Sequence, residues 1–493
     1  MKKKLLINIS LLISFLFIYR PTYAMTVEQS NKQQTGSGND IFIPYVSSGA
    51  SVPGVPDSNY NVRVNVPYFS GNVSDHYHEA AIFWFGRVTA SENYADIRFA
   101  YDNNILWVYM PAFDQYMWYD ESPNTSDLTA WDGATLQIDL DGNTGSSPDG
   151  SSYRFDAALS WGDQRSQYQA AYRWQNGQWV KSSVTFSSLR GYRGAFNDNA
   201  QGARGWAITF QIPFTALGLS GRPADGTIWG AGLTMHDRDS SGGPALADKS
   251  WPGGFNANQP STWAQLHYGL PNYSAVPGTV TGSDLIRRDT SRGIDVPDAG
   301  LGGTTPNLCP GDESYIFNTW GNVSSYSQHP DFNIQNQSDV SDFPCFSKYY
   351  ITFPLGTVPA NKTILSARLI LHHQGSAGNA GQAIPSLIQV LTVSGDWSEN
   401  SITWNNAPLP KENVSQAWVD IPKNFDYQLW PGLRREWDVT GAASQAYQSG
   451  QPLRLALYEA DSEYHSGKYF TSSESGDWNI NGRPALEIKW GDR

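Results

Sequence analysis

The 493-residue sequence has little cysteine, a deficit of basic residues and no long apolar run beyond its N-terminus. Two cysteines exclude a small disulfide-dense scaffold. Because 33 lysines and arginines stand against 46 acidic residues, nucleic acid and anionic membranes are poor partners. HExxH, nucleophile-elbow and Ser-His-Asp patterns do not occur, so the sequence indicates no catalytic residue and no organic cofactor.

The N-terminus has the pattern of a secretory signal peptide. Three lysines at positions 2–4 precede an apolar run over 5–18, and an acceptable cleavage site ends at Ala24. The run is short for a transmembrane span, although a retained anchor is the alternative. Removing 1–24 takes away four basic residues and leaves a net charge of 29 − 46 = −17. We therefore expect a secreted or cell-surface protein with no transmembrane segment after cleavage, and a flexible leader over 25–40.

Short strands and turns dominate what remains, with 46 glycines and 29 prolines. Ile97, Phe99 and Tyr101 alternate with polar neighbours, and a similar alternation from Leu106 to Met110 follows the turn Asp102-Asn103-Asn104. This pattern predicts a hairpin of half-buried strands. Such patterns recur without intervening helices, except for a short helix expected over 442–448 with Thr440 as its N-cap. The prediction is an all-β chain of two β-sandwich, jelly-roll-like domains in tandem.

The first domain is expected over 41–272. In order it contains AYDNNILWVYM, WDGATLQIDLDG, GWAITFQIPFTALGL, GAGLTMHDRD and STWAQLHYG. This series resembles the family 9 carbohydrate-binding modules from near Asp57 to Gly269. The resemblance implies a β-sandwich that binds sugar without cleaving it, through tryptophans in loops. Because the same sandwich carries haem in some redox proteins, the fold alone does not identify the ligand.

The second domain is expected over 273–491, with 273–305 as a linker or a first strand. Its most specific stretch, DWSENSITWNNAPLP over 396–410, predicts a short strand that ends in a turn. The stretch resembles the W-x-E-x-x-x-T-W-N-x-x-P signature of the DNRLRE domains, which overlap the family 96 carbohydrate-binding modules. Phe353-Pro-Leu, Trp437-Asp438-Val439-Thr440, Glu474 and Arg483-Pro484 also fit that pattern. The resemblance implies a jelly-roll sandwich of secreted and envelope proteins.

Two groups of residues are candidates for binding in the first domain. Trp118, Tyr119 and Trp251 lie in turn-rich connections, where an aromatic face could stack on a sugar or could cap the core. Asp139, Asp141, Asn143 and Asp149 crowd oxygen atoms into one turn, which suits calcium but also suits a plain strand-end turn. His236 in the run His236–Asp239 is more typical of a hydrogen-bonded residue than of a metal ligand.

Two further features lie in the second domain. The run from Glu459 to Tyr469 gathers charge and aromatics between two strands, and His465 and Lys468 are its candidates for a glycan site, against a plain solvated loop. Cys309 and Cys345 are expected to form a disulfide after export, with two buried thiols as the alternative.

These observations favour a secreted, non-catalytic protein that binds a polysaccharide or another glycan. A structural or adhesive cell-envelope protein, with other envelope proteins as partners, is the alternative. A hidden polysaccharide hydrolase or lyase and a haem-binding module are weaker alternatives. Carboxylates are too numerous for one pair to be chosen as a glycosidase acid and base.

Overall fold

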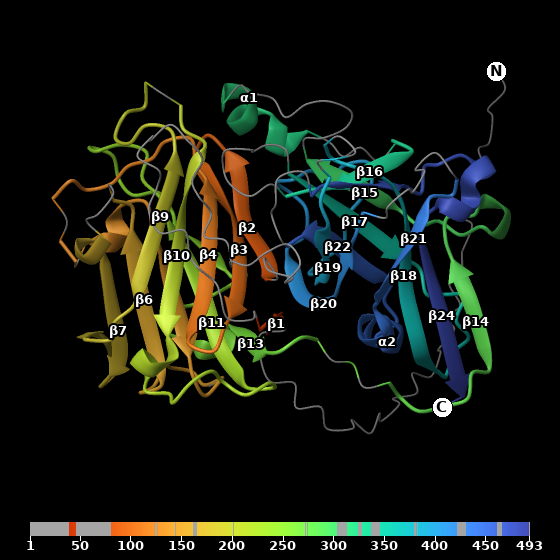
Figure 1. The fold of residues 1–493 in the computed structure, drawn as a ribbon, viewed down its shortest axis with the longest axis horizontal. Helices are drawn as coiled ribbons and strands as arrows, with labels where there is room; N and C mark the ends of the chain where they lie inside the picture. The colour runs from red at the N-terminus through yellow and green to blue at the C-terminus, as the bar shows by residue number, and fades with distance from the viewer. Residues whose placement is uncertain are drawn as a thin grey trace, which may run out of the picture. The chain divides into compact units, whose positions relative to one another are not determined.

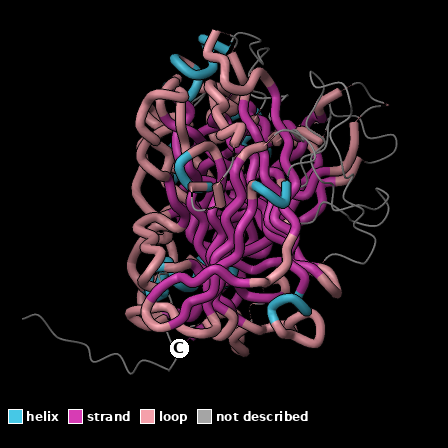
Figure 2. Tube along the Cα trace, turned by 90° about the vertical axis from the view of Figure 1, so that its left-hand side faces the viewer, coloured by secondary structure: helices cyan, strands magenta, loops and turns pink. Residues whose placement is uncertain are grey.

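The computed structural model of the protein describes residues 39–45, 80–122, 124–125, 127–142, 144–160, 165–200, 202–271, 273, 275–302, 313–323, 328–336, 346–378, 381, 383–421, 430–460 and 466–492. The described chain is all β, as the sequence predicts (Figure 2). Its helices are short: α1 (Glu313–Asn318), α2 (Thr440–Gln448) and the 3-10 turns η2 (Leu128–Ala130), η3 (Arg165–Gln167), η4 (Phe214–Leu217), η5 (Pro260–Thr262), η6 (Thr290–Arg292), η7 (Trp320–Asn322) and η8 (Asp477–Gly482). None of these helices is long and apolar enough to cross a membrane.

The N-terminal half contains a five-stranded antiparallel sheet that faces a longer sheet (Figure 1). The five strands are, in order, β2 (Ala81–Thr89), β3 (Glu92–Tyr101), β4 (Ile105–Phe113), β10 (Gly205–Pro213) and β9 (Ser187–Arg193). The facing strands are β1 (Asp40–Ile43), β13 (Ala264–Tyr268), β11 (Ile228–His236), β5 (Gly133–Asp139), β6 (Ser152–Ala158), β7 (Gln169–Gln175) and β8 (Gln178–Ser182), with β12 (Lys249–Trp251) beside β11. The hairpin predicted around Asp102 is β3–β4.

The C-terminal half contributes five more strands to the long sheet and adds a six-stranded sheet. The long sheet continues past β1 with β20 (Pro410–Val419), β19 (Ser386–Val393), β22 (Leu453–Glu459), β17 (Ser347–Phe353) and β15 (Asp298–Gly302). The six-stranded sheet holds β14 (Gly282–Ile286), β24 (Ala485–Asp492), β18 (Lys362–Ser376), β23 (Lys468–Thr471) and β16 (Asp331–Ile334), with β21 (Leu433–Asp438) beside β18. Strands β14 and β15 therefore occupy the stretch expected as a linker or first strand.

Strand β22 is buried on both faces, and this explains how the halves join. Leu453, Leu455 and Leu457 face the six-stranded sheet and belong to the C-terminal core. The intervening Ala456 and Tyr458 belong to the core of the N-terminal half. Since successive side chains of a strand point to opposite faces, one strand serves both cores. Residues 36–493 form one compact unit, and the domain boundary near 272 stays a prediction.

The tryptophan-rich stretch over 396–410 lies at this junction. It is an irregular loop between β19 and β20, so the prediction of a short strand is wrong. Its backbone instead forms turns, with Ile402 N donating to Ser398 O and Ala407 N to Thr403 O. Trp404 is 4% exposed and packs with Trp320 and Tyr94, at 4.8 and 5.2 Å between ring centroids. Burial of these side chains outweighs the β-branched character of 401–403.

Asparagine side chains connect the halves as a neighbouring strand would. Asn405 accepts from Val88 N at 2.8 Å and donates to Val88 O at 3.0 Å. Asn413 binds both backbone groups of Phe42 in β1 in the same way, each at 2.8 Å. A carboxamide carries an acceptor oxygen and an NH₂ donor, so it can pair with the N–H and C=O groups of one strand residue.

A buried polar cluster lies between the same two halves. Asp96 on β3 accepts hydrogen bonds from the hydroxyl groups of Tyr94 and Tyr458 and from Asn336 Nδ2. Lys348 on β17 is 1% exposed and donates to the Tyr94 hydroxyl at 2.7 Å. Its Nζ lies 3.7 Å from the ring centroid of Trp404 and 4.3 Å from that of Trp84. The cluster thus joins charges from both halves through one tyrosine.

The predicted short helix is α2, with a different start. It begins at Thr440, and its preceding residue, Val439, makes no side-chain cap. Asp438 Oδ1 accepts from both the backbone and the hydroxyl of Thr440, so the capping oxygen comes from aspartate. Gly450 follows the helix in the left-handed region that favours glycine.

Candidate functional site

The predicted aromatic anchors of the N-terminal half differ in their burial. Trp118 and Tyr119 are half-buried in the connection after β4. Trp118 Nε1 donates to Asn199 at 2.6 Å, and Tyr119 packs edge-on against Tyr168 and Phe196. Both therefore retain some exposed surface, but Tyr119 serves mainly as packing.

The expectation that Trp251 lies in an open loop is wrong. Trp251 ends β12, is 1% exposed, and packs against Phe83 and Phe99 at 5.3 and 5.8 Å between ring centroids. The surrounding Pro and Gly residues suggested a loop, but three residues of β12 pair with β11 and turn the indole inward. Both ring faces are covered, so the structure leaves no face for a sugar.

The prediction that Lys468 belongs to a glycan site is also wrong. Its side chain is fully buried, and Nζ donates to the backbone oxygens of Ile384 and Ser466. An ammonium group without exposed surface cannot bind a glycan from solvent, so Lys468 is a structural residue. His465 lies outside the described residues.

The predicted calcium ligands that the structure describes do come together. Carboxylate oxygens of Asp139, Asp141 and Asp149 lie within 4.8 Å of one another. Ser151 and Ser152 donate to Asp139, and Ser151 also donates to Asp149, so the turn is stabilised without an ion as well. Burial raises the pKa of Asp139 to about 6. Asn143, Cys309 and Cys345 lie outside the described residues, so the fourth ligand and the disulfide stay predictions.

An exposed tryptophan pair in the C-terminal half is the clearest aromatic surface. Trp430 is 53% exposed and Trp478 is 69% exposed, and their rings meet edge-to-face at 4.7 Å between centroids. Trp430 precedes β21, and Trp478 lies in η8. Large apolar side chains exposed together commonly mark a binding surface. The pair offers open ring faces of the kind that Trp251 lacks.

The turn that carries Trp478 is held firmly. Arg483 donates to Ser475 O at 2.8 Å and forms an ion pair with Asp477 at 2.9 Å. Arg287 donates to Ile480 O, and His372 on β18 bonds Gly482 O at 3.1 Å through Nδ1. Burial lowers the pKa of His372. A neutral His372 donating from Nδ1 keeps η8 attached to the six-stranded sheet.

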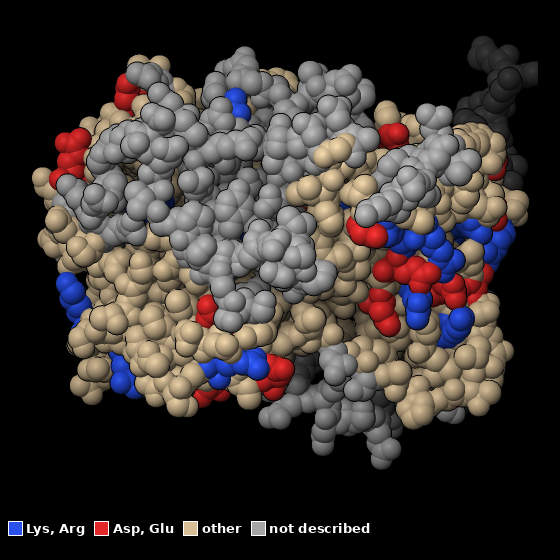
Figure 3. All heavy atoms as spheres, in the orientation of Figure 1, with Lys and Arg blue, Asp and Glu red and all other residues tan. Residues whose placement is uncertain are grey.

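A ladder of charged pairs extends from this turn across β18, β21 and β24. It comprises Arg368–Glu436, Arg434–Glu436, Arg434–Glu487 and Lys489–Glu487, with N···O distances of 2.5–3.1 Å. Figure 3 shows acidic and basic side chains gathered over these strands. Hydrogen bonds from Arg368 and Lys489 lower the pKa values of Glu436 and Glu487, respectively. The surface is therefore rich in donors and acceptors yet balanced in charge.

A shallow hollow adjoins the ladder. It has a volume of about 370 Å³ and is lined by β20 and β21, including Trp418, Arg434 and Glu436. Trp418 is half-buried there, so it contributes a second aromatic edge. Aromatic faces beside hydrogen-bonding side chains suit a polar ligand with apolar C–H faces.

Sequence reasoning missed the pair, although the signal was present. Trp430 is followed by Pro431-Gly432, and Trp478 follows Gly476-Asp477, so both satisfy the turn-context criterion that selected Trp118 and Trp251. The local sequence does not show which of the tryptophans next to turns are buried and which are exposed. The two exposed tryptophans and the ladder are brought together by cross-strand pairing of residues up to 130 positions apart.

Fold and surface together define a β-sandwich protein with an exposed face of aromatic and charged side chains. Residues 305–489, which include the tryptophan pair, match the model of carbohydrate-binding module family 96. This match confirms the resemblance predicted for the C-terminal half. No curated protein matches the chain.

Solved structures similar to the N-terminal half include two of family 9 modules. A family 9 carbohydrate-binding module from Caldicellulosiruptor kristjanssonii in complex with cellotriose is 16% identical, with a TM-score of 0.29, and the alignment covers 48% of this chain and 98% of that one. Its complex with glucose is also 16% identical, with a TM-score of 0.28, covering 48% and 100%. These are the family that the sequence motifs of the first domain resemble.

Proposed function

We propose that this protein is an exported, non-catalytic carbohydrate-binding protein and that Trp430 and Trp478 form the centre of its binding surface. The observation that carries the proposal is the exposed edge-to-face tryptophan pair within the part of the chain that matches a carbohydrate-binding family. The N-terminal basic and apolar segments support export.

The aromatic pair supplies the apolar part of sugar recognition. The C–H groups of a pyranose ring form a flat apolar face, and a tryptophan covers such a face without requiring a charge on the ligand. The two rings are nearly perpendicular, at 86°, so a sugar that stacks on one meets the edge of the other. Anchoring of η8 by Arg483 and His372 reduces the ordering cost of binding.

The charged ladder supplies the polar part. Guanidinium groups and carboxylates can each bind two neighbouring hydroxyl groups of a sugar. Because acidic and basic side chains alternate along the ladder, it favours a neutral, hydroxyl-rich ligand over a strongly charged one. This fits a polysaccharide better than nucleic acid.

The test measures retention and turnover with the mature chain. The protein is applied to a panel of insoluble polysaccharides and to a glycan array, and the tightest ligand is titrated with wild type, Trp430→Ala and Trp478→Ala. Each truncation should cost about 2 kcal/mol of binding free energy, or roughly thirtyfold in affinity, as is typical for a central aromatic anchor. No reducing ends should appear on prolonged incubation.

The matched control is Trp179→Ala, which removes a half-buried tryptophan of β8 that also meets another tryptophan edge-to-face. All three variants should retain wild-type melting temperatures within the range of surface substitutions, about 0.5 kcal/mol in stability. Unchanged binding by the Trp430→Ala/Trp478→Ala double variant would move the site elsewhere, and loss in Trp179→Ala alone would place it in the N-terminal half. Release of sugar would make the protein an enzyme.

A further inference from the structure

The exposed tryptophan pair of the C-terminal half does not form a flat platform. The ring planes of Trp430 and Trp478 are 86° apart, and their centroids are 4.7 Å apart. Only one of two perpendicular rings can lie flat on a plane of packed sugar rings, and the other then meets that plane edge-on. A single sugar unit fits the corner between the rings, because its face can stack on one indole while its side contacts the other.

The charged ladder continues from the pair along the outward face of β18. The intervening residues Leu369 and Leu371 belong to the C-terminal core, so every second residue of β18 faces away from it. Starting at the end of β18 that contacts η8, the outward register pairs are His372–Arg434, Ile370–Glu436, Arg368–Glu487 and Ser366–Lys489. Because a strand rises about 3.3–3.4 Å per residue, these four levels extend over about 20 Å (Figure 3). This is longer than one sugar unit, so the ladder can contact several units of one chain.

The ion pairs of the ladder leave hydrogen-bond donors for a ligand. Glu436 accepts from Arg434 and Arg368, and Glu487 is paired with Arg434 and Lys489. Within the described residues, Arg434 uses Nε and Nη2 in these pairs and Arg368 uses Nη1, so Arg434 Nη1 and the other two nitrogens of Arg368 make no protein hydrogen bond. A guanidinium group donates and does not accept, so these N–H groups require acceptor oxygens.

The physical state of a polysaccharide decides whether it offers such oxygens. In a crystalline polysaccharide the hydroxyl groups already form hydrogen bonds with neighbouring chains. Covering the ladder with such a surface would take its N–H groups out of water without giving them partners, which costs free energy. A dissolved or amorphous chain exposes hydroxyl oxygens along its whole length, so it can satisfy the ladder at each level.

We propose that Trp430, Trp478 and the charged ladder bind a single extended glycan chain in soluble or amorphous form, and not the surface of a crystalline polysaccharide. The proposal rests on the proposed function, since it assigns the form of the ligand that the same surface takes. One sugar unit occupies the corner between the two indoles. Further units of the chain contact Arg434, Arg368 and Lys489 in turn.

The first experiment measures how affinity depends on chain length. The mature full-length protein is titrated calorimetrically with cello-, laminari-, manno- and xylo-oligosaccharides of two to six units. For at least one series, affinity should rise by at least about tenfold from the disaccharide to the hexasaccharide, because each added unit reaches another level of the ladder. Retention on swollen amorphous and on microcrystalline cellulose is the second comparison, and any retention should be confined to the amorphous form.

A double variant tests the end of the ladder that lies away from the tryptophans. Arg368→Gln/Lys489→Gln should lower the ratio of hexasaccharide to disaccharide affinity by about tenfold, because only the longer ligand reaches these two side chains. A partly unfolded fraction would weaken both affinities alike, so the ratio does not depend on stability. The matched control is Arg222→Gln, which removes an exposed arginine paired with Asp225 in the N-terminal half and should keep the ratio.

The outcomes separate this proposal from the proposed function. If the wild type binds no member of the four series, or if Trp430→Ala and Trp478→Ala bind them as the wild type does, this proposal fails together with the proposed function. Three results overturn this proposal alone while the tryptophan variants still lose affinity. They are equal wild-type affinity for all chain lengths, an unchanged affinity ratio in Arg368→Gln/Lys489→Gln, and equal retention on microcrystalline and amorphous cellulose.

Discussion

Replacing Asp96 or Lys348 tests how the two halves are joined. Asp96→Ala removes the acceptor of three buried hydrogen bonds, from Tyr94, Tyr458 and Asn336. Lys348→Met removes the buried ammonium group, whose pKa burial lowers and Asp96 raises. Methionine retains much of the volume among the aromatic rings.

The expected magnitudes follow from the burial of both groups. Removing one partner of a buried charged pair costs about 3–5 kcal/mol, because the other partner is left uncompensated. Removing both should cost less than the sum of the two by about 1–3 kcal/mol, as found for residues in one network. Here the network runs from Lys348 through the Tyr94 hydroxyl to Asp96.

Urea unfolding of the wild type, both single variants and the double variant measures this coupling. Coincident transitions by tryptophan fluorescence and circular dichroism would show that both halves unfold together. Additivity of the two substitutions within about 0.5 kcal/mol would refute the reasoning, since it would mean that the two charges do not act on each other. Tyr94→Phe is the control, because it keeps the ring and interrupts only the hydroxyl between the charges.

Three other outcomes can be measured. Burial, followed by the charges of Lys468 and Arg435, lowers the pKa of His373 from 6.5 to about 3. Between these two pH values the unfolded state therefore binds a proton that the folded state does not. The free energy of unfolding should fall by about 1.4 kcal/mol per pH unit as the pH decreases from 6.5 toward 3. His373→Gln should remove that component, and equal pH slopes for both proteins would contradict it. Trp251→Ala should lose about 3–5 kcal/mol of stability as a large core truncation, measured by urea unfolding, and a loss below 1 kcal/mol would show that the indole is not in the core. Chelator should lower the melting temperature of the wild type if Asp139, Asp141 and Asp149 hold calcium, and Asp149→Asn should abolish that response; an unchanged melt in chelator would remove this ion.

Alternation of apolar residues predicted the strands well, because burial of one face has a period of two in any strand. The hairpin at Asp102 is an example. The β-branched run over 401–403 predicted a strand wrongly, because Ile402 and Trp404 are buried from a loop. Alternation identifies a buried side chain, but it does not identify the layer that covers it.

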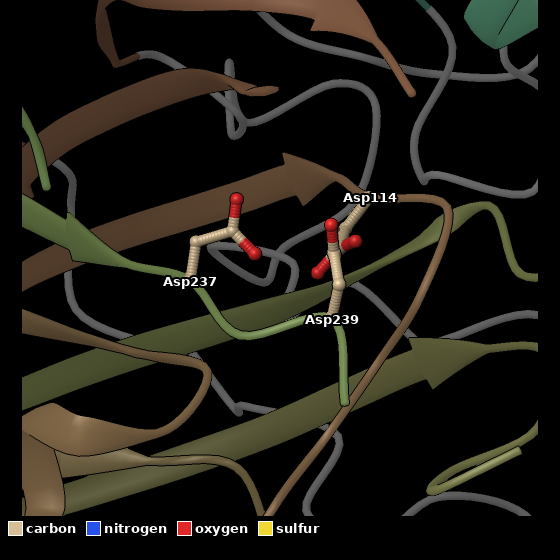
Figure 4. Close-up of side chains that lie close together, drawn as sticks. All are labelled: Asp114, Asp237 and Asp239. Atoms are coloured by element: carbon tan, nitrogen blue, oxygen red, sulfur yellow. The ribbon is translucent and has the colours of Figure 1, made fainter. Parts of the chain in front are cut away.

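The candidate sites were harder to predict, since they depend on contacts distant in sequence. The Asp139 turn is local, and its carboxylates meet as expected. The carboxylates of Asp114, which follows β4, and of Asp237 and Asp239, which follow β11, lie within 4.8 Å of one another (Figure 4) only because those strands are brought together, so no spacing in the sequence could reveal this group. Likewise, Trp251 and Trp430 have similar local sequence, and only the pairing of β12 with β11 turns one of them inward.

The two-faced strand β22 has a consequence for dividing the chain. A cut near residue 272 would leave Tyr458, Ala456 and Trp404 of the C-terminal piece facing water, together with the buried ammonium of Lys348. It would also strip β1 of its partner Asn413. Each fragment would expose an apolar surface and an unpaired charge, so it should aggregate or reassociate with the other fragment. The two sandwiches are therefore parts of one folding unit and not independently folding domains that can be exchanged separately.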